Sequence, residues 1–286
     1  WYIGISNLGR KYYVAGEYRE ALREFKTVAN MNPDFGKARM YLMRTYYHLD
    51  QMDEYLEERK KITDSKTFSD DLGKEYYLLA YDFFSLGQYN IALENLEEAL
   101  EMNPEYLEAR FLIAETLFQL DRFDESIFHY QHIIDKYDRY KESEYYDDAL
   151  LGGGWCAYLL GDYAQSQKYL ELLLEDFPKS SLYQEGMHKL GRVYFEQEKY
   201  QQTIEVYEKL LKMDSLEYDT SEIEYFLGQS YFWAENYSTA KDFLANILED
   251  DSDFAFINET KYFYSFSLFR EERYDEALEI LEELIS

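Results

Sequence analysis

The chain contains very little proline, glycine or cysteine. Its 286 residues include three prolines, 13 glycines and a single cysteine, Cys156. One cysteine excludes an intrachain disulfide, and the neighbours Trp155, Ala157 and Tyr158 predict that it is a small buried side chain. Because proline and glycine interrupt regular structure, their scarcity favours a nearly all-helical chain with short turns. No run of 18 apolar residues occurs either, so we expect no membrane-spanning helix.

Basic residues are scarce as well. Lysine and arginine total 29 against 58 acidic residues, which gives a net charge of -29. Such a surface repels phosphate backbones and anionic lipid, so we expect no nucleic-acid partner. A solvated helical surface is enough to explain the acidity. The chain is instead rich in aromatic side chains, with 32 tyrosines and 19 phenylalanines.

A pattern of small and aromatic residues recurs eight times along the chain. It is clearest in residues 80–104, where Ala80 is followed by Phe83, Gly87 and Tyr89, and Pro104 ends the unit. We call the small-residue position the slot, because a small side chain there lets two helices approach closely. The slot residues are Gly9, Met43, Ala80, Ala114, Gly154, Gly191, Gly228 and Ser265, of which Met43 is the one clear departure.

Seven residues after each slot lies a position where the first helix of each pair should end. This turn position holds Gly16, Asp50, Gly87, Asp121, Gly161, Glu198, Glu235 and Glu272. Glycine adopts a left-handed helix cap at little cost, whereas other residues do so less readily. The three glutamates therefore predict a differently built turn in the last three repeats.

This spacing resembles the tetratricopeptide repeat, a helix-turn-helix unit of about 34 residues. The resemblance implies an all-α fold, a right-handed superhelical solenoid of about eight antiparallel helix pairs. It also implies a single array over residues 1–286, with repeats near 2–35, 36–70, 73–106, 107–140, 147–180, 184–217, 221–254 and 258–286. Members of the family hold protein or peptide partners, so the expected function is a non-enzymatic interaction scaffold without a cofactor, as part of a larger complex.

The longest spacing between slots lies around residues 135–148. We favour an extended helix plus a short turn there, and the alternative is a hinge or boundary between two halves of the chain. The glycine run 152–154 follows. A phosphate-binding loop is disfavoured, because no strand precedes the run and no Lys-Ser/Thr pair follows it. We expect close packing or local bending instead.

A second, shorter resemblance concerns the junction Phe177-Pro178-Lys179-Ser180, followed by Leu182 and Tyr183. It is similar to repeat proteins of bacterial cell envelopes, such as outer-membrane assembly lipoproteins and Tol-Pal-associated periplasmic proteins. This favours a periplasmic or envelope location, with the cytoplasm as the alternative. The chain starts at Trp1 without an initiator Met, which fits a removed signal, a removed anchor or earlier repeats.

Catalytic and metal sites are not indicated. His129 and His132 are three residues apart, with Asp135 a further turn on, a spacing that could place metal ligands on one helix face. Tyr130 and Ile133 take the core positions of that helix, however, so we expect the histidines to point to solvent. We therefore predict no metal site and no catalytic residue.

The candidate partner-binding surface is the groove that first helices line in tetratricopeptide arrays. Its residues lie one and four places after the slot and two and three before it. Four places after the slot an aromatic occurs in every repeat: Tyr13, Tyr47, Phe84, Phe118, Tyr158, Phe195, Phe232 and Phe269. The other candidates on this face are Arg10, Arg44, Tyr77, Tyr81, Phe111, Trp155, Arg192, Tyr225, Trp233, Tyr262 and Phe266. The alternative is that these rings only stack between adjacent first helices.

Family knowledge also provides a test for one groove chemistry, the clamp that binds a C-terminal carboxylate in chaperone-binding members. Its positions hold Ser6, Arg10 and Tyr41 here, so the clamp is absent. Positive charge is nevertheless expected on the inner face of repeats one to three, where it would steer an acidic partner segment. The residues concerned are Arg10, Lys37, Arg44 and Lys74.

We expect the C-terminal aromatic run to be the apolar anchor of binding. Its groove-facing members are Tyr225, Phe232, Tyr262, Phe266 and Phe269, which should form one contiguous patch. The competing account is that these rings hold repeats seven and eight together. A different function is an envelope accessory protein that binds a small apolar ligand or serves a transporter or assembly machine. A closed apolar pocket around Trp155, Trp233 and the glycine run would favour that alternative.

Overall fold

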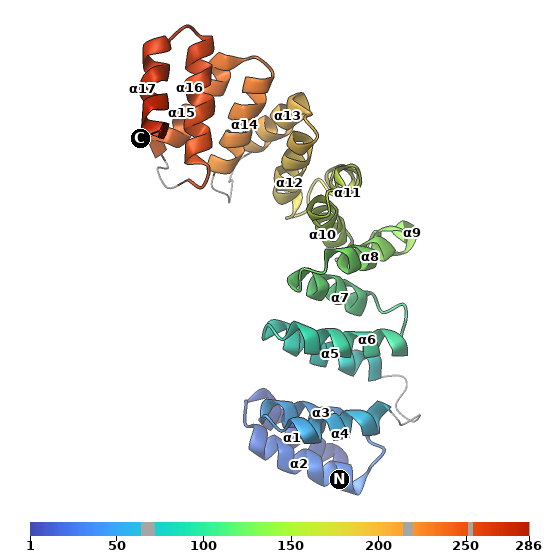
Figure 1. The fold of residues 1–286 in the computed structure, drawn as a ribbon. Helices are drawn as coiled ribbons and strands as arrows, with labels where there is room; N and C mark the ends of the chain where they lie inside the picture. Colours follow the sequence, from blue (N-terminus) through green and yellow to red (C-terminus); the bar gives the residue numbers. More distant parts are fainter. Residues whose placement is uncertain (64–71, 214–219, 251–253, 286) are drawn as a thin grey trace. The chain divides into compact units, whose positions relative to one another are not determined.

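The chain folds as a series of helical hairpins. A computed structural model describes residues 1–63, 72–213, 220–250 and 254–285, which contain 17 α-helices and no strand (Figure 1). The helices are α1 (Tyr2–Val14), α2 (Tyr18–Met31), α3 (Gly36–His48), α4 (Met52–Thr63), α5 (Leu72–Ser85), α6 (Tyr89–Met102), α7 (Leu107–Gln119), α8 (Phe123–Ile134), α9 (Tyr137–Tyr140), α10 (Tyr146–Leu159), α11 (Tyr163–Asp176), α12 (Tyr183–Glu196), α13 (Tyr200–Leu211), α14 (Ser221–Trp233), α15 (Tyr237–Asp250), α16 (Ile257–Arg270) and α17 (Tyr274–Ile285). Within the described residues, no helix is both long and apolar enough to cross a lipid bilayer.

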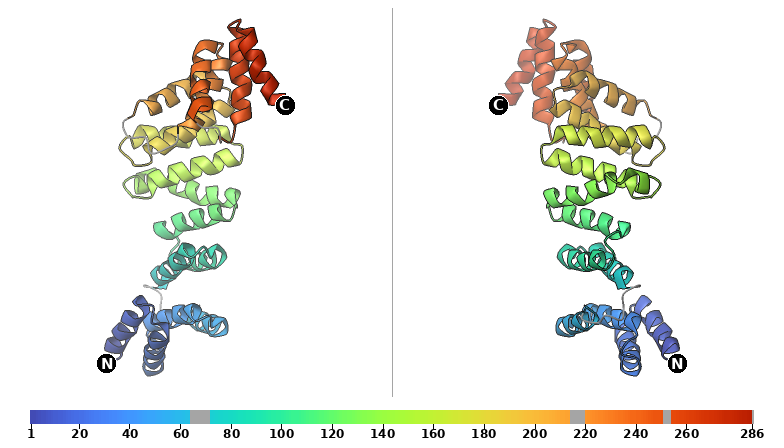
Figure 2. Two further views of the ribbon diagram at one scale, coloured as in Figure 1. Left: turned by 90° about the vertical axis from the view of Figure 1, so that its left-hand side faces the viewer. Right: turned by 90° about the vertical axis from the view of Figure 1, so that its right-hand side faces the viewer.

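Apart from the one-turn helix α9, the helices form eight successive pairs. We call the members of each pair the first and second helix. The chain divides into two compact units, residues 1–129 and 130–286, which we name unit 1 and unit 2. Within unit 2, the pairs α10–α11 and α12–α13, drawn in yellow-green to ochre, lie side by side in both views of Figure 2.

The extended helix expected over residues 135–148 is not formed. Helix α8 ends at Ile134, and the separate α9 and a turn fill the segment before α10. The unit boundary falls a few residues earlier, between His129 and Tyr130.

The slot works as the spacing predicts, by admitting a side chain from the second helix. A methyl group added at Gly9 would lie 2.9 Å from the Phe25 ring, and one at Gly228 would lie 2.6 Å from Leu244. In both pairs the contacting residue follows the slot by 16 positions, which is also true of Gly154 with Leu170 and Gly191 with Tyr207. The small residue therefore sets how closely the two helices of a hairpin approach.

The prediction of a differently built turn in the last three repeats is wrong. Glu198, Glu235 and Glu272 have φ of 58°, 62° and 64°, which is the left-handed conformation that Gly16 adopts at 78°. The backbone hydrogen bonds are also shared. In the first repeat the Gly16 N–H donates to Tyr13 and the Glu17 N–H to Tyr12, and the same two bonds recur at all eight turns. This pair of bonds is the Schellman helix end, which these glutamates form despite their Cβ.

The glycine run and the cysteine are both packed, as predicted. A methyl group at Gly152 would lie 2.5 Å from the Tyr130 ring, and one at Gly154 would lie 2.9 Å from Leu170. Cys156 is fully buried. The run therefore serves close helix packing in unit 2.

Candidate functional site

The candidate residues lie on the face of the first helices. In unit 1, α1, α3, α5 and α7 contact one another in sequence, and in unit 2 the series is α10, α12, α14 and α16. Side-chain exposure separates the candidates into three groups. Arg10, Tyr81, Trp233, Tyr262 and Phe269 are exposed, Arg44 and Tyr225 are buried, and Tyr13, Tyr47, Tyr77, Phe84, Phe111, Phe118, Trp155, Tyr158, Arg192, Phe195, Phe232 and Phe266 are half-buried.

The recurring aromatic four places after the slot has a local structural role. Its ring contacts the ring that begins the second helix of the same hairpin, with centroids 5.2–5.8 Å apart in seven repeats. The pairs are Tyr13–Tyr18, Phe84–Tyr89, Phe118–Phe123, Tyr158–Tyr163, Phe195–Tyr200, Phe232–Tyr237 and Phe269–Tyr274. Its recurrence therefore reflects closure of the turn, and aromatic identity at this position does not distinguish a binding residue.

Arg44 connects three consecutive first helices of unit 1. Its guanidinium forms an ion pair with Asp82 of α5 and lies 5.3 Å from the Tyr13 ring centroid of α1. The Tyr13 hydroxyl in turn lies 2.8 Å from Nε2 of His48. Because Arg44 is only 6% exposed and Asp82 neutralises it, the expectation that it adds open positive charge to this face is wrong.

Burial sets the protonation of the groups around Arg44. Burial raises the pKa of Tyr13, and burial followed by the nearby Arg44 charge lowers the pKa of His48. The ring of His48 stacks on Tyr18 at a centroid distance of 4.4 Å. At neutral pH His48 is therefore a neutral member of an aromatic cluster.

Arg192 has the equivalent role in unit 2. Its guanidinium donates to the Tyr158 hydroxyl of α10 at 3.2 Å and pairs with Glu222 of α14 at 3.0 Å. It also lies 5.4 Å from the centroid of the Phe226 ring. Arg192 and Arg44 thus occupy the same register position and each links a tyrosine of the preceding repeat to a carboxylate of the following one.

Lys189 covers the ring of Trp155, which lies beside the Arg192–Tyr158 contact. Nζ of Lys189 lies 3.9 Å from the Trp155 ring centroid, and Trp155 stacks on Tyr158 at 4.5 Å. Burial lowers the pKa of Lys189, which pairs with Glu185 at 3.3 Å. Both cationic side chains of this region, Lys189 and Arg192, are thereby paired with carboxylates of the protein.

Of the five rings expected to form one patch in unit 2, four are connected, and the inclusion of Tyr225 was wrong because its ring is buried. The connected rings are Phe232, Tyr262, Phe266 and Phe269. Trp233 and Phe232 both contact Phe263, at centroid distances of 6.1 and 5.3 Å. The series continues from Phe263 through Tyr262 to Phe266 and Phe269. We call the part formed by Trp233, Tyr262 and Phe269 the aromatic patch, because these rings are 51%, 46% and 51% exposed.

Tyr225 lies apart from this exposed patch. It is 7% exposed and contacts Phe254 and Phe256, from the segment before α16, at 5.7 and 5.1 Å. Its ring is consequently a core residue of unit 2.

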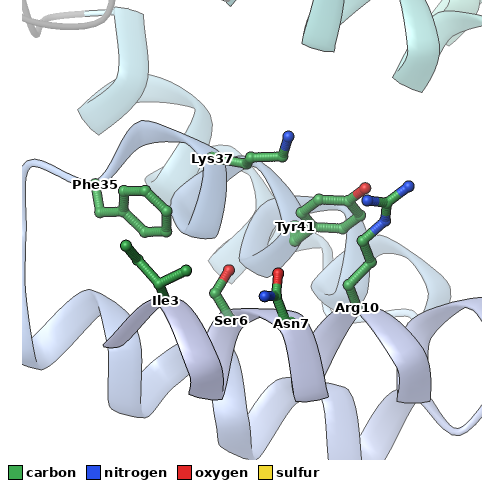
Figure 3. Close-up of a pocket in the computed structure, with 7 residues that line it drawn as sticks. All are labelled: Ile3, Ser6, Asn7, Arg10, Phe35, Lys37 and Tyr41. Atoms are coloured by element: carbon green, nitrogen blue, oxygen red, sulfur yellow. The ribbon is translucent and has the colours of Figure 1, made fainter. Parts of the chain in front are cut away.

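In unit 1 a pocket opens between α1 and α3. Its volume is ≈ 260 Å³, and Figure 3 shows the side chains of both helices around it. The lining residues are Ile3, Ser6, Asn7, Arg10, Phe35, Lys37 and Tyr41. Arg10 and Lys37 were both expected from the sequence to place positive charge on this face. Ser6, Asn7 and Tyr41 also lie at groove positions of the repeat, whereas Ile3 and Phe35 lie outside them and had no repeat signal.

The prediction that the histidines of α8 point to solvent is wrong. His129 and His132 are half-buried, with Nδ1 of His129 and Nε2 of His132 shielded from solvent. Tyr130 and Ile133 are buried as expected. In the part of the chain that the structure describes, no group of three or more histidine, cysteine, aspartate or glutamate side chains is placed to hold a metal ion.

Comparison with protein families agrees with this repeat architecture. A family model described as anaphase-promoting complex, cyclosome, subunit 3 matches residues 64–133 and 196–284, which together make up more than half of the chain. Two tetratricopeptide repeat models match residues 148–180 and 6–54. The chain belongs to the tetratricopeptide repeat proteins.

Among curated proteins, the chain is similar to the protein O-mannosyl-transferase TMTC1 of Homo sapiens. The identity is 25% over 196 residues, which cover 66% of this chain and 21% of that protein. The chain thus spans about a fifth of the length of this relative.

Solved structures share the fold at low sequence identity. A chain in the structure of Naa15/Naa10 bound to HypK-THB matches 96% of this chain and 41% of its own length, with a TM-score of 0.64 and 11% identity. A tetratricopeptide repeat protein from Parabacteroides merdae matches 93% of this chain and 98% of its own, with a TM-score of 0.45 and 15% identity. The first likeness supports the helical repeat fold.

Proposed function

We propose that this chain is a non-enzymatic scaffold that binds a protein partner along its first-helix face, with the aromatic patch of unit 2 as the apolar anchor. The tetratricopeptide fold supports the general class, a protein–protein interaction scaffold. The observation that supports the particular site is the exposure of Trp233, Tyr262 and Phe269 on a connected series of rings. Exposed aromatic groups that lie together on a folded protein are typical of interaction surfaces.

The polar groups of the first helices favour a scaffold over an enzyme. Arg44 and Arg192 are held in links between helices, and burial lowers the pKa of His48 and of His188. Arg44 and Arg192 therefore have structural partners, and the one hydroxyl–imidazole contact among these groups, Tyr13 with His48, is half-buried in an aromatic cluster. Membership of a larger complex is part of the same proposal, because a scaffold acts through the proteins it holds.

The small-ligand alternative has less support. It requires a closed, empty apolar pocket beside the glycine run, but Tyr130 and Leu170 fill the space against Gly152 and Gly154. Trp155 is covered by Lys189 and stacked on Tyr158. We therefore favour a protein partner over a small apolar molecule.

The exposed rings give a cleaner test than the half-buried ones. Phe232 and Phe266 are half-buried and pack on neighbouring rings at 5.3 and 4.6 Å, so alanine there would disturb the hairpins more than at Phe269, which is 51% exposed although it contacts Tyr274 at 5.2 Å. Replacement of Phe269 by alanine should weaken partner binding by about 2 kcal/mol, or about 30-fold in Kd, as expected of an aromatic anchor. The partner would be obtained by affinity capture with the purified chain, identified, and titrated by calorimetry.

Phe128 provides the matched control. This phenylalanine is 62% exposed and lies on a second helix, α8, away from the first-helix face. Phe128→Ala should leave the affinity unchanged, while thermal unfolding of both variants reports on the fold. Equal affinities for the wild-type, Phe269→Ala and Phe128→Ala chains would rule out the aromatic patch as the anchor.

A further inference from the structure

The pocket between α1 and α3 has a polar end and an apolar end. In Figure 3 the Arg10 guanidinium lies beside the Tyr41 hydroxyl, and Ile3 and Phe35 lie at the other end. The volume of ≈ 260 Å³ is below the 300–1,000 Å³ that is typical of small-molecule sites, so the pocket suits one or two side chains. A partner segment that fills it would present a polar and an apolar side chain next to each other.

The charge of the surrounding helices differs from that of the chain as a whole. Helices α1 and α3 contain five basic residues and no acidic residue, in a chain whose net charge is -29. Three of these five pair with carboxylates of neighbouring helices: Arg39 with Glu58, Arg44 with Asp82 and, at the longer distance of 4.0 Å, Lys37 with Glu75. The local surplus of positive charge therefore lies at Arg10 and its neighbour Lys11, with the loosely paired Lys37 on the facing helix.

Arg10 occupies the same register position as Arg44 and Arg192 but has a different environment. Each of those two arginines forms an ion pair with a carboxylate of one neighbouring first helix and lies over a tyrosine ring of the other. Among the residues that the structure describes, no carboxylate forms an ion pair with Arg10, which is exposed. Lys37 is 52% exposed at its side chain and forms a long ion pair with Glu75, at 4.0 Å.

The partners of Arg44 and Arg192 indicate which chemical group would pair with Arg10. A guanidinium in this register is satisfied by a carboxylate that approaches along the first-helix face, as Asp82 does for Arg44. Arg10 and Lys37 together could hold such a group from outside, with charge-assisted hydrogen bonds to its oxygens. Ser6 and Asn7 line the same pocket and add hydrogen-bonding groups.

We propose that the α1–α3 pocket binds an acidic side chain of a partner polypeptide, with an apolar side chain of the same segment against Ile3 and Phe35. This inference rests on the proposed function, because it names what the protein partner presents to unit 1. It goes beyond that function by assigning a second contact that does not involve the aromatic patch.

The test uses random 12-residue peptides displayed on phage and selected on the immobilised full chain. Enriched peptides are then synthesised with a fluorescent label, each beside a counterpart in which every Asp and Glu is replaced by Asn and Gln. Fluorescence anisotropy gives their affinity for the wild-type chain at 50 and 500 mM NaCl. We expect enrichment of an acidic residue next to an apolar one, and about tenfold weaker binding of the amide counterpart and at high salt.

The variants Arg10→Ala and Lys37→Ala should each weaken the enriched peptide about tenfold, whereas Arg10→Lys should retain most of the affinity. Arg19→Ala is the matched control, because Arg19 is an exposed arginine on the second helix α2. All replaced side chains are exposed, so thermal unfolding should match the wild type. Affinity that does not change in Arg10→Ala or Lys37→Ala overturns the proposal, as does equal binding of the amide counterpart.

A Phe269→Ala chain measured with the same peptides separates the two proposals. If Phe269→Ala weakens binding and Arg10→Ala does not, the pocket inference fails and the proposed function stands. If no peptide binds the wild-type chain above background, the pocket inference fails and the scaffold would have to recognise folded surfaces only. Weakening by Arg10→Ala without an effect of Phe269→Ala supports the pocket and moves the anchor away from the aromatic patch.

Discussion

Replacing the turn glutamates by glycine should stabilise unit 2. Glu198, Glu235 and Glu272 hold the left-handed conformation with φ between 58° and 64°, and their side chains are exposed. This conformation costs a residue with a Cβ about 1–2 kcal/mol, and it costs glycine nothing. Glycine loses about 0.5–1 kcal/mol more backbone entropy on folding, which offsets part of the gain. The net increase in unfolding free energy is therefore about 0.5–1 kcal/mol per site.

The effect is measurable by far-UV circular dichroism during thermal and urea unfolding. For a unit of this size, 1 kcal/mol raises Tm by about 2–4 °C. The three changes lie in separate repeats and should be nearly additive, so the triple variant should gain about 2 kcal/mol. Sites this far apart share no partner that would couple them.

Two control variants isolate the backbone effect. Glu235→Gln removes the charge but keeps the Cβ, and it should leave Tm within about 1 °C of the wild type because the side chain is exposed. Glu279→Gly places glycine in the exposed interior of α17, where it should cost about 1 kcal/mol. If Glu235→Gly lowered Tm as Glu279→Gly does, the left-handed conformation would not be the limiting feature of this turn.

Three further predictions concern the links within the units. Asp82→Ala should lower the free energy of unfolding by about 2 kcal/mol in urea titrations, because it leaves the buried Arg44 charge unpaired. This loss is smaller than the usual 3–5 kcal/mol for a broken buried ion pair, because Asp82 is 37% exposed and solvent screens its charge. Gly191→Ala should cost about 1–3 kcal/mol, because its methyl group would overlap with the Tyr207 ring, and the loss should appear as a lower Tm. The free energy of unfolding should fall as pH is lowered from 7 towards 5. Burial lowers the pKa of His48 below its usual 6.5, so the unfolded chain binds the proton at a higher pH than the folded chain does. His48→Gln should therefore reduce the slope of unfolding free energy against pH.

Each of these three predictions has a control variant or a measurement that could contradict it. Arg44→Met removes the charge together with its need for a partner and should cost less than Asp82→Ala. Gly4→Ala adds a methyl group where nothing lies within 4 Å, so it should raise Tm, and a loss equal to that of Gly191→Ala would contradict the packing argument. An unchanged slope between pH 7 and 5 in His48→Gln would show that this histidine is solvated.

The sequence alone predicts the hairpins, but neither the ion pairs that link them nor the segments between them. The slot and its partner are fixed by a spacing of 16 residues, so the small residues could be recognised without a structure. The carboxylates that meet Arg44 and Arg192 have no such spacing. Asp82 lies two residues after its own slot and Glu222 lies six before, and α9 and the segments between hairpins also have no fixed length.

Burial at one register position likewise depends on segments outside the repeat. Tyr225 and Tyr262 both lie three residues before a slot, yet Tyr225 is 7% exposed and Tyr262 is 46% exposed. Phe254 and Phe256, which cover Tyr225, come from the segment before α16. Aromatic identity at a groove position therefore could not tell core from surface, and the turn-closing ring pairs explain most of what looked like a binding signal.

The closure of each hairpin by its own sequence has a mechanical consequence. The turn rings are five residues apart, as in Phe84 and Tyr89, and the slot contact spans 16 residues, as in Gly228 and Leu244. A pulling force that opens one hairpin leaves the closures of its neighbours intact, because stability in a repeat array is local. Under tension the chain should therefore lengthen in steps of one hairpin, each releasing roughly 100 Å of extended chain. The hairpins linked through Arg44 or Arg192 should be the last of these steps, because their ion pairs must break before they open.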